Sequence, residues 1–166
     1  MIRNYDVIYF LDIVERILGD SICKSQKGKK SMKIVVIDGQ GGRMGSTFID
    51  KWIKSGGDPK SIIAVGTNSM ATMAMMKAGA VKAATGENPV IVNTASADFV
   101  VGPIGIIAAD ALLGEITPRM ARAVASCAAQ KVLLPVNTCM FHVVGVSDNR
   151  LSDNIDEAIS YILKNN

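Results

Sequence analysis

The clearest chemical signal in this sequence is a cluster of glycines that directly follows a short apolar run. Gly39 permits a sharp turn, and Gly41 would let the backbone approach a pyrophosphate. A helix that begins near Gly42 would point its free N–H groups and its positive dipole end at the same anion. Arg43 could add a charge to the phosphate. The predicted nucleotide-binding loop therefore consists of Gly39, Gln40, Gly41, Gly42, Arg43, Met44 and Gly45.

This loop does not match the phosphate-binding loop of P-loop enzymes. Its spacing is G-x-G-x-x-x-G, with Met44 where the tighter dinucleotide motif has glycine. Alignment of Gly45-Ser46-Thr47 with the end of a P-loop leaves no lysine to reach the phosphates. The same alignment puts Gln40 where the first glycine belongs. The loop therefore favours nucleotide binding over phosphoryl transfer.

Four further loops rich in glycine and small polar residues follow the other expected strands. Ligands of open parallel sheets bind at the carboxyl ends of the strands, so these loops predict one shared crevice. They lie at residues 66–68, 86–88, 102–105 and 137. The additional contacts expected from them are Thr67, Asn68, Gly86, Glu87, Gly102 and Pro103.

The loop after the second expected strand bears on the identity of the cofactor. Folds that bind NAD usually place a carboxylate there to bond both ribose hydroxyls. This sequence has Gly66-Thr67-Asn68-Ser69 instead. The hydroxyl and amide groups favour NADP or an adenine nucleotide over NAD, although Ser69 could equally serve only as a helix cap.

Groups able to act as an acid, a base or a nucleophile are scarce. Glu87 and Glu115 are the carboxylates nearest the expected crevice, with Asp110 on a helix face behind them. His142 lies in an apolar stretch and is expected to be structural, and Cys139 has no evident partner. The tyrosines occur only in the terminal segments, at Tyr5, Tyr9 and Tyr161. No catalytic residue is assigned, and enzymatic activity stays open.

Cysteine and methionine usage points to a reduced interior without metal. The three cysteines are odd in number and widely spaced, at Cys23, Cys127 and Cys139. Neither a disulfide framework nor a zinc site is expected, which favours a cytoplasmic protein with no metal. The spacing of Met70, Met73 and Met76 suggests core filling.

The elements that must position these loops alternate along the chain. Strands are expected at residues 33–38, 61–65, 81–84, 98–101 and 131–136, and a short antiparallel strand at 142–146. Helices are expected at 42–55, 69–78, 104–113, 118–129 and 151–163. Residues 88–92 fit a short helix or a strand, and a crossover between parallel strands favours the helix. This order predicts an α/β, Rossmann-like, open and mostly parallel sheet of five to six strands, with helices on both faces.

Residues 1–31 do not share this pattern, and residues 32–166 form the expected nucleotide-binding domain. Apolar residues at helical spacing in the leader predict an amphipathic helix, followed by a basic linker at residues 24–30. No apolar run there is long enough to span a membrane. We expect either that Met32 is the natural start and the leader is an upstream extension, or that the leader is a loosely attached helix.

The charge distribution argues against nucleic acid as a partner. Residues 1–33 contain seven Lys/Arg and four Asp/Glu, and residues 34–166 contain eleven of each. The domain is therefore neutral and lacks a basic footprint. The alanine-rich residues 118–129 would allow close approach of a second subunit, so a homo-oligomer is a candidate state.

Two resemblances refine these expectations. Gly41-Gly42-Arg43-Met44-Gly45 resembles the NAD(P)H-binding loop of dihydrodipicolinate reductases, but their catalytic motif and substrate domain have no counterpart here. Residues 32–163 are similar to a bacterial family of Rossmann-like domains of unknown function. The phrases that carry this likeness are V-V-I-D-G-Q-G-G, A-V-G-T-N-S, A-T-G-E-N, G-P-I-G-I, L-L-G-E-I-T-P and L-P-V-N.

The sequence thus predicts a domain that binds NAD(P) or another nucleotide. It could be a minimal oxidoreductase or the cofactor-binding subunit of a larger enzyme. The alternative is a non-catalytic sensor or binding module for a nucleotide or small metabolite, which needs only the loops.

Overall fold

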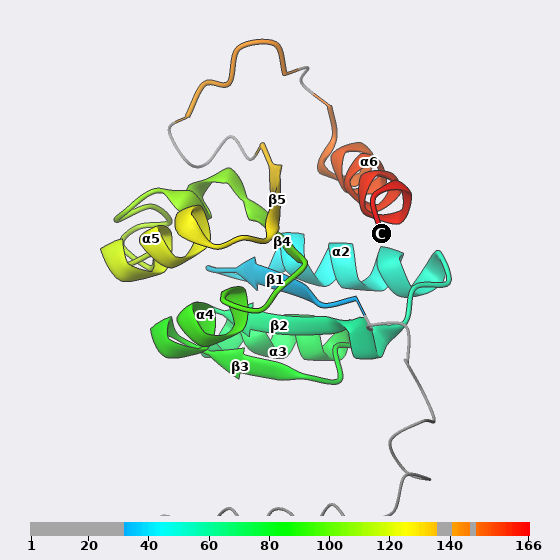
Figure 1. Cartoon of the computed structure of the whole chain (residues 1–166), viewed down its shortest axis with the longest axis horizontal. Helices are drawn as coiled ribbons and strands as arrows, with labels where there is room; N and C mark the ends of the chain where they lie inside the picture. The colour runs from blue at the N-terminus through cyan, green and yellow to red at the C-terminus, as the bar shows by residue number, and fades with distance from the viewer. Residues whose placement is uncertain (1–31, 136–140, 147–148) are drawn as a thin grey trace, which may run out of the picture. The chain divides into compact units, whose positions relative to one another are not determined.

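A single open sheet of five parallel strands forms the centre of the domain (Figure 1). The computed structural model describes residues 32–135, 141–146 and 149–166. The predictions for the leader, for Asn137 and for Cys139 lie outside these residues. The strand order is β3-β2-β1-β4-β5, which confirms the predicted Rossmann-like architecture.

The strands are β1 (Ile34–Asp38), β2 (Ile62–Gly66), β3 (Ala83–Thr85), β4 (Phe99–Pro103) and β5 (Gln130–Leu134). Every residue of β1 is buried, because β1 is the central strand and has helices on both faces. Its last residue, Asp38, lies in register with Gly66 of β2. The carboxyl ends of β1 and β2 therefore meet side by side.

Helices cover both faces of the sheet. One core joins the sheet to α2 (Arg43–Lys54), α3 (Ser69–Lys77) and α6 (Leu151–Lys164). The other joins it to α4 (Glu87–Thr94) and α5 (Pro118–Ser126). Two short 3-10 helices, η1 (Pro59–Ser61) and η2 (Ile104–Ile107), complete the described elements. None of the helices in the described ranges is both long and apolar enough to cross a membrane.

Local sequence explains most helix starts. Asn68, rather than Ser69, caps α3, because its side chain accepts a hydrogen bond from the N–H of Ala71 (2.9 Å). Thr117 caps α5, and Pro118 follows it at the first helical position. The helical interpretation of residues 88–92 is confirmed by α4.

The prediction of a helix over residues 104–113 is wrong. Only η2 forms, and turns follow it, with positive φ at Asp110 (63°), Leu112 (55°) and Leu113 (60°). Ile106 and Leu112 are nevertheless buried in the second core. The apolar residues of this run pack into the core from a loop. Periodicity alone does not distinguish such a loop from a helix.

The predicted strand at residues 142–146 is also wrong. The described residues there contain a turn, and His142 is exposed instead of lying in an apolar strand. The predicted role of three methionines is likewise corrected. Met70, Met73 and Met76 are 71%, 56% and 54% exposed, whereas Met75 is fully buried against α2. The buried side of α3 instead carries Ala71, Thr72 and Met75.

Candidate functional site

The strand order reverses between β1 and β4, and the glycine loop begins at this switch point. β2 lies on one side of β1 and β4 on the other, so their connections diverge at the carboxyl ends, where sheets of this kind commonly bind ligands. We refer to this region as the crevice. The structure therefore puts the predicted loop, residues 39–45, at the position where ligands of such sheets bind.

Asp38 closes the inner side of this loop. Its two carboxylate oxygens accept hydrogen bonds from the N–H of Gly39 (2.8 Å) and of Gly45 (2.7 Å). Gly42, the residue before α2, supplies no side-chain cap, so the Asp38 carboxylate takes over that role from the end of β1. The helix end that was predicted to face a phosphate thus already has an acidic partner within the chain.

Glu115 closes the outer side, and it comes from the loop between β4 and α5. Its Oε2 accepts hydrogen bonds from the backbone N–H of Gln40 (2.9 Å), from Asn68 Nδ2 (3.0 Å) and from the Thr67 hydroxyl. Asn68 Nδ2 also donates to the Gln40 carbonyl (3.0 Å). Glu115 therefore ties the loops after β1 and β2 together, and its Oε1 has no partner among the described residues.

The pKa values of Asp38 and Glu115 are shifted in opposite directions. Burial raises the pKa of Asp38 above its ordinary value of 3.8, although N–H groups of Gly45, Gly39 and Met44 act against this, and the nearby Glu115 charge raises it further. Partial burial also acts to raise the pKa of Glu115. Hydrogen bonds from Thr67, Gln40 and Asn68 outweigh that effect and hold the pKa of Glu115 below its ordinary value. Glu115 is therefore the ionised acceptor at neutral pH.

Backbone strain concentrates at the same contact. Among the described residues, four non-glycine residues have positive φ: Gln40 (50°), Asp110, Leu112 and Leu113. Gln40 donates to Glu115, and the other three lie within five residues before it. Such conformations cost on the order of 1–3 kcal/mol each and tend to occur where function requires them. The strain marks the Gln40–Glu115 contact as a candidate site.

The glycines of the loop have different roles. A Cβ on Gly39 would lie 2.6 Å from Glu115 Oε2 and 2.7 Å from Thr67 Oγ1, so only glycine allows this close approach. A Cβ on Gly42 or Gly45 would collide with α3, since the nearest atoms belong to Ala71 and Met75 at 2.6 Å. Gly41 faces open space. A side chain at Gly41 would therefore not disturb the packing of the loop.

The remaining predicted contacts do not all gather here. Gln40, Thr67 and Asn68 meet at Glu115, whereas Met44 is 5% exposed and packs in the first core. The side chain of Arg43 is exposed at the start of α2, and Gly102 and Pro103 are buried at the end of β4. The other members of the predicted site occupy a second cluster beside α5.

This second cluster is built on Glu87. Glu87 follows Gly86, the left-handed residue before α4 (φ 102°). Its Oε2 accepts from the Thr117 hydroxyl (2.5 Å), and its Oε1 pairs with Arg119 Nη1 (2.9 Å). Glu87 thereby connects the starts of α4 and α5.

A family model described as a domain of unknown function, DUF3842, matches residues 33–166. The chain belongs to the DUF3842 family. No curated protein and no solved structure matches it.

Sequence reasoning missed two parts of the DUF3842 crevice. Asp38 was treated only as the end of a strand, although a carboxylate directly before a glycine turn and a helix is a recognisable capping signal. Glu115 was named as a nearby carboxylate without a role. It is 75 residues from Gln40 in sequence, and no local pattern indicates that contact.

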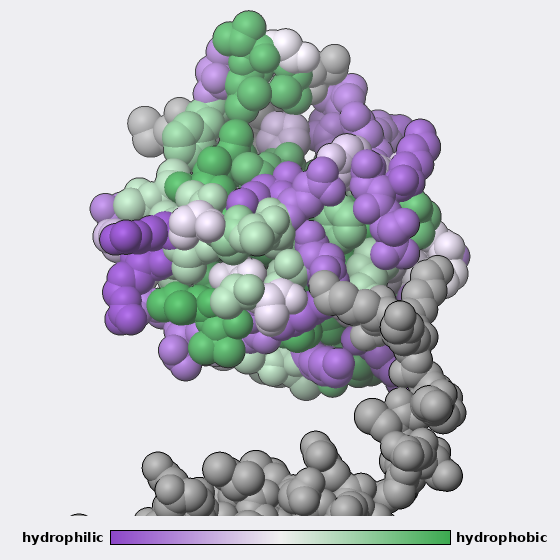
Figure 2. Space-filling model, viewed as in Figure 1, coloured by the Kyte–Doolittle hydropathy of each residue, from purple (hydrophilic) through white to green (hydrophobic). Residues whose placement is uncertain are grey.

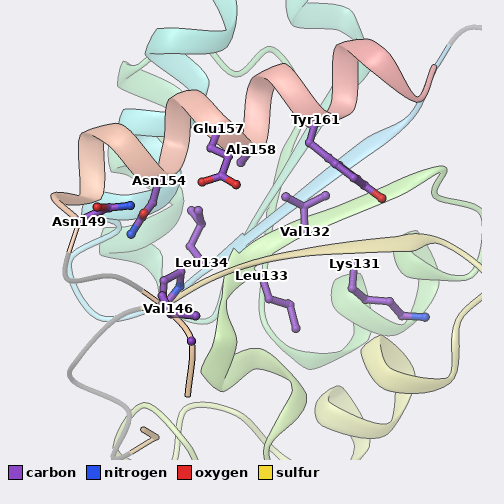
Figure 3. A pocket seen from close by; sticks show the side chains of 12 residues that line it. Lys131, Val132, Leu133, Leu134, Val146, Asn149, Asn154, Glu157, Ala158 and Tyr161 are labelled. Atoms are coloured by element: carbon purple, nitrogen blue, oxygen red, sulfur yellow. The ribbon is translucent and has the colours of Figure 1, made fainter. Parts of the chain in front are cut away.

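A separate pocket of about 490 Å³ lies between β5 and α6 of the DUF3842 domain, away from the glycine loop (Figure 3). Its walls include Val132 and Leu134 of β5 and Asn154, Ala158 and Tyr161 of α6. None of these residues was predicted as part of a site. Within the described ranges, no group of three His, Cys, Asp or Glu side chains could hold a metal ion.

Proposed function

We propose that the crevice at the glycine loop binds a ribonucleotide, and that the favoured ligand class is a nicotinamide dinucleotide with a free ribose 2′-hydroxyl. The observation that carries the proposal is Glu115. It supplies, from another loop, the carboxylate that the sequence after β2 lacks. Its lowered pKa and its unpartnered Oε1 suit it to accept bonds from ribose hydroxyls.

Fewer backbone N–H groups are available to a phosphate than the glycine pattern implies. Asp38 already engages the N–H groups of Gly39 and Gly45, and Glu115 engages that of Gln40. The N–H groups of Gly41 and Arg43 have no acceptor among the described residues. A phosphate would therefore be held by these two donors and by the exposed guanidinium of Arg43.

Glu115 also bears on the choice between NAD and NADP. The residue types after β2 favoured NADP, because no carboxylate follows that strand in sequence. An ionised carboxylate beside Thr67 and Asn68 would repel a 2′-phosphate, so the proposed order of affinity is NAD(H) over NADP(H).

The same contacts favour the non-catalytic alternative over an oxidoreductase. Asp38 and Glu87 are each engaged by the chain itself, and Oε2 of Glu115 accepts from three donors. A base that must take up a proton during turnover would accept fewer hydrogen bonds from the chain itself. A sensor or cofactor-carrying module therefore fits the crevice better than a complete active site.

Thermal unfolding in the presence of candidate ligands tests this function. NADH, NADPH, ATP and S-adenosylmethionine would each be titrated to millimolar concentration. The expected result is a rise in melting temperature with NADH that exceeds the rise with NADPH, because a ligand that binds only the native state stabilises it. The absence of a shift with all four compounds would refute the proposal.

Two variants locate the ligand. Gly41→Asp should abolish the shift without loss of fold, since a side chain there meets open space. Ser160→Asp adds the same charge on the exposed side of α6 and should leave the shift intact. Glu115→Gln should reduce the preference for NADH over NADPH. A preserved shift in Gly41→Asp would place the ligand elsewhere.

A further inference from the structure

Among the residues that the structure describes, no strand lies beside the outer edge of β5. β5 is the last strand of the sheet, next to β4. The N–H of Gln130 donates to the carbonyl of Asp98, so Gln130 faces β4. Backbone groups alternate in direction along a strand. Lys131 and Leu133 therefore turn their N–H and C=O groups away from the sheet.

The pocket of about 490 Å³ runs along this edge. It is lined by the consecutive residues Lys131–Pro135, a pattern that marks the side of a strand rather than one of its faces. In Figure 3, side chains of Asn154, Glu157 and Tyr161 project from α6 toward β5. We call this space the β5 slot.

Asn154 is the unusual member of the β5 slot. It is only 9% exposed and makes no side-chain hydrogen bond within the described residues, but its amide atoms are open to solvent in the slot, because no buried side-chain N or O of those residues lacks a partner. An amide offers both a donor and an acceptor, as does a peptide backbone. Together with the free edge of β5, it matches an extended peptide better than it matches a purely apolar ligand.

An apolar segment of the same chain lies at the mouth of the β5 slot. Residues 141–146 read F-H-V-V-G-V, and Gly145 and Val146 line the slot. The exposed fractions are 46% for Phe141, 87% for Val144 and 47% for Val146. Figure 2 shows this segment as a hydrophobic projection at the top of the view. β-Branched and aromatic residues of this kind favour extended pairing.

We propose that the β5 slot is filled by residues 141–146 of a second copy of this chain, which pair with β5 as a sixth strand. The exchange is reciprocal. Because slot and segment adjoin on one edge of the molecule, a single two-fold axis at that edge can place each segment in the slot of the other copy. Backbone groups of Lys131 and Leu133, and the amide of Asn154, would then obtain partners.

The conformation of the segment favours a second copy over its own chain. The N–H of Val146 donates to the carbonyl of Val143 (3.4 Å), and Gly145 is left-handed (φ 87°). In one copy the segment therefore closes into a turn that exposes Val144, and it does not lie along β5. Glu157 in the slot also offers a carboxylate to His142, the one ionisable side chain of the segment.

Light scattering of the full chain over a range of concentrations tests the association. A dimer is expected at micromolar concentration. Val144→Asp should weaken it about 100-fold, because the carboxylate would enter an apolar interface. Its thermal stability at low concentration should be unchanged, since Val144 is 87% exposed. Val81→Asp, a matched change at a residue that is 62% exposed near β3, should leave the dimer intact.

Amide hydrogen exchange distinguishes the occupants of the β5 slot. The N–H groups of Lys131 and Leu133 should be protected in the dimer, and protection should fall at least tenfold when the protein is diluted below its dissociation constant. Protection that persists in the monomer would show that the chain fills its own slot and would overturn the proposal. A wild-type chain that stays monomeric, or a Val144→Asp dimer as tight as wild type, would overturn it as well.

Discussion

The glycine-loop crevice and the β5 slot each contain a polar residue that is more than nine-tenths buried. The two residues differ in whether their side chains have hydrogen-bond partners within the chain. Asp38, 5% exposed, accepts hydrogen bonds from Gly39 and Gly45. Asn154, 9% exposed, has no side-chain partner among the described residues. The first arrangement stabilises the folded chain by itself. The second leaves the amide open to solvent and available to a bound partner.

The two helix starts differ in the same sense. α2 begins after Gly42, and a carboxylate from the neighbouring strand compensates its N-terminus. α6 begins after Arg150, whose side chain makes no capping bond. The two proposals rest on this contrast: a small ligand at the crevice, whose polar groups are paired within the chain, and a second copy at the edge of β5.

Removal of the Asp38 carboxylate should have the largest effect on this comparison. Asp38→Ala leaves the N–H groups of Gly39 and Gly45 without an acceptor in a buried site. We expect the free energy of unfolding to fall by about 3 kcal/mol. Urea denaturation would measure this change. A loss below about 1 kcal/mol would show that the hydrogen bonds of the carboxylate contribute little to stability.

A methyl group at Gly39 should have a smaller effect on the same side. Its Cβ would lie 2.6 Å from Glu115 Oε2, so Glu115 must move out of its contacts with Gln40 and Thr67. Gly39→Ala should lower the free energy of unfolding by about 1–2 kcal/mol. Gly41→Ala is the matched control and should change it by less than about 0.5 kcal/mol. Equal effects of the two variants would contradict the structure of the loop.

The pH dependence of stability should separate the two carboxylates of the crevice. The pKa of Glu115 is lowered from its ordinary 4.5, so its stabilising effect is complete above pH 4.5 and is lost as the pH falls through the lowered pKa. The pKa of Asp38 is raised from 3.8, so its effect has the opposite sign: it is complete below pH 3.8 and is lost as the pH rises through the raised pKa. Glu115→Gln should therefore differ from wild type at pH 7, and the difference should narrow below pH 4.5. Urea midpoints at both pH values would measure this, and a constant difference would argue against an ionised Glu115.

Truncation of Asn154 should have the smallest effect. Because its amide has no partner within the described chain, Asn154→Ala should change the stability of the monomer by less than about 1 kcal/mol, far less than Asp38→Ala. Denaturation at a concentration where the protein is monomeric would measure it. A loss as large as that of Asp38→Ala would mean that Asn154 has a structural partner, and the contrast between the two regions would fail.

The parts of the fold that sequence reasoning predicted share a physical cause. β1 is buried on both faces, and its side chains must then be apolar without interruption, which a short run such as Ile34–Ile37 displays directly. Asn68 and Thr117 precede helices, and their local hydrogen bonds follow from residue type and position. Local chemistry of this kind is complete within a few residues.

The predictions of local structure and burial were wrong where packing between residues distant in sequence decides the conformation. Residues 104–113 are apolar enough for a helix, but the second core takes Ile106 and Leu112 from a loop. The spacing of the methionines on α3 is compatible with a buried stripe and equally with the exposed stripe that the structure shows. Only the position of α2 selects Met75 for burial and leaves Met70, Met73 and Met76 exposed. A periodic pattern gives the relative angles of side chains around a helix, but not the direction of the core.

By itself, the sequence determined the alternating elements, the parallel sheet and the place of the glycine loop, because each follows from local patterns of residue types: short apolar runs, helical periodicity between them, and crossovers long enough to join parallel strands. The tertiary structure alone decided what surrounds that loop. It placed Glu115 beside Gln40, which is 75 residues away in sequence, and it directed Asp38 at the start of α2. It also left the outer edge of β5, within the described part of the chain, without a neighbouring strand. These contacts join residues on different elements, so their energies depend on how the elements pack and leave no local pattern in the sequence.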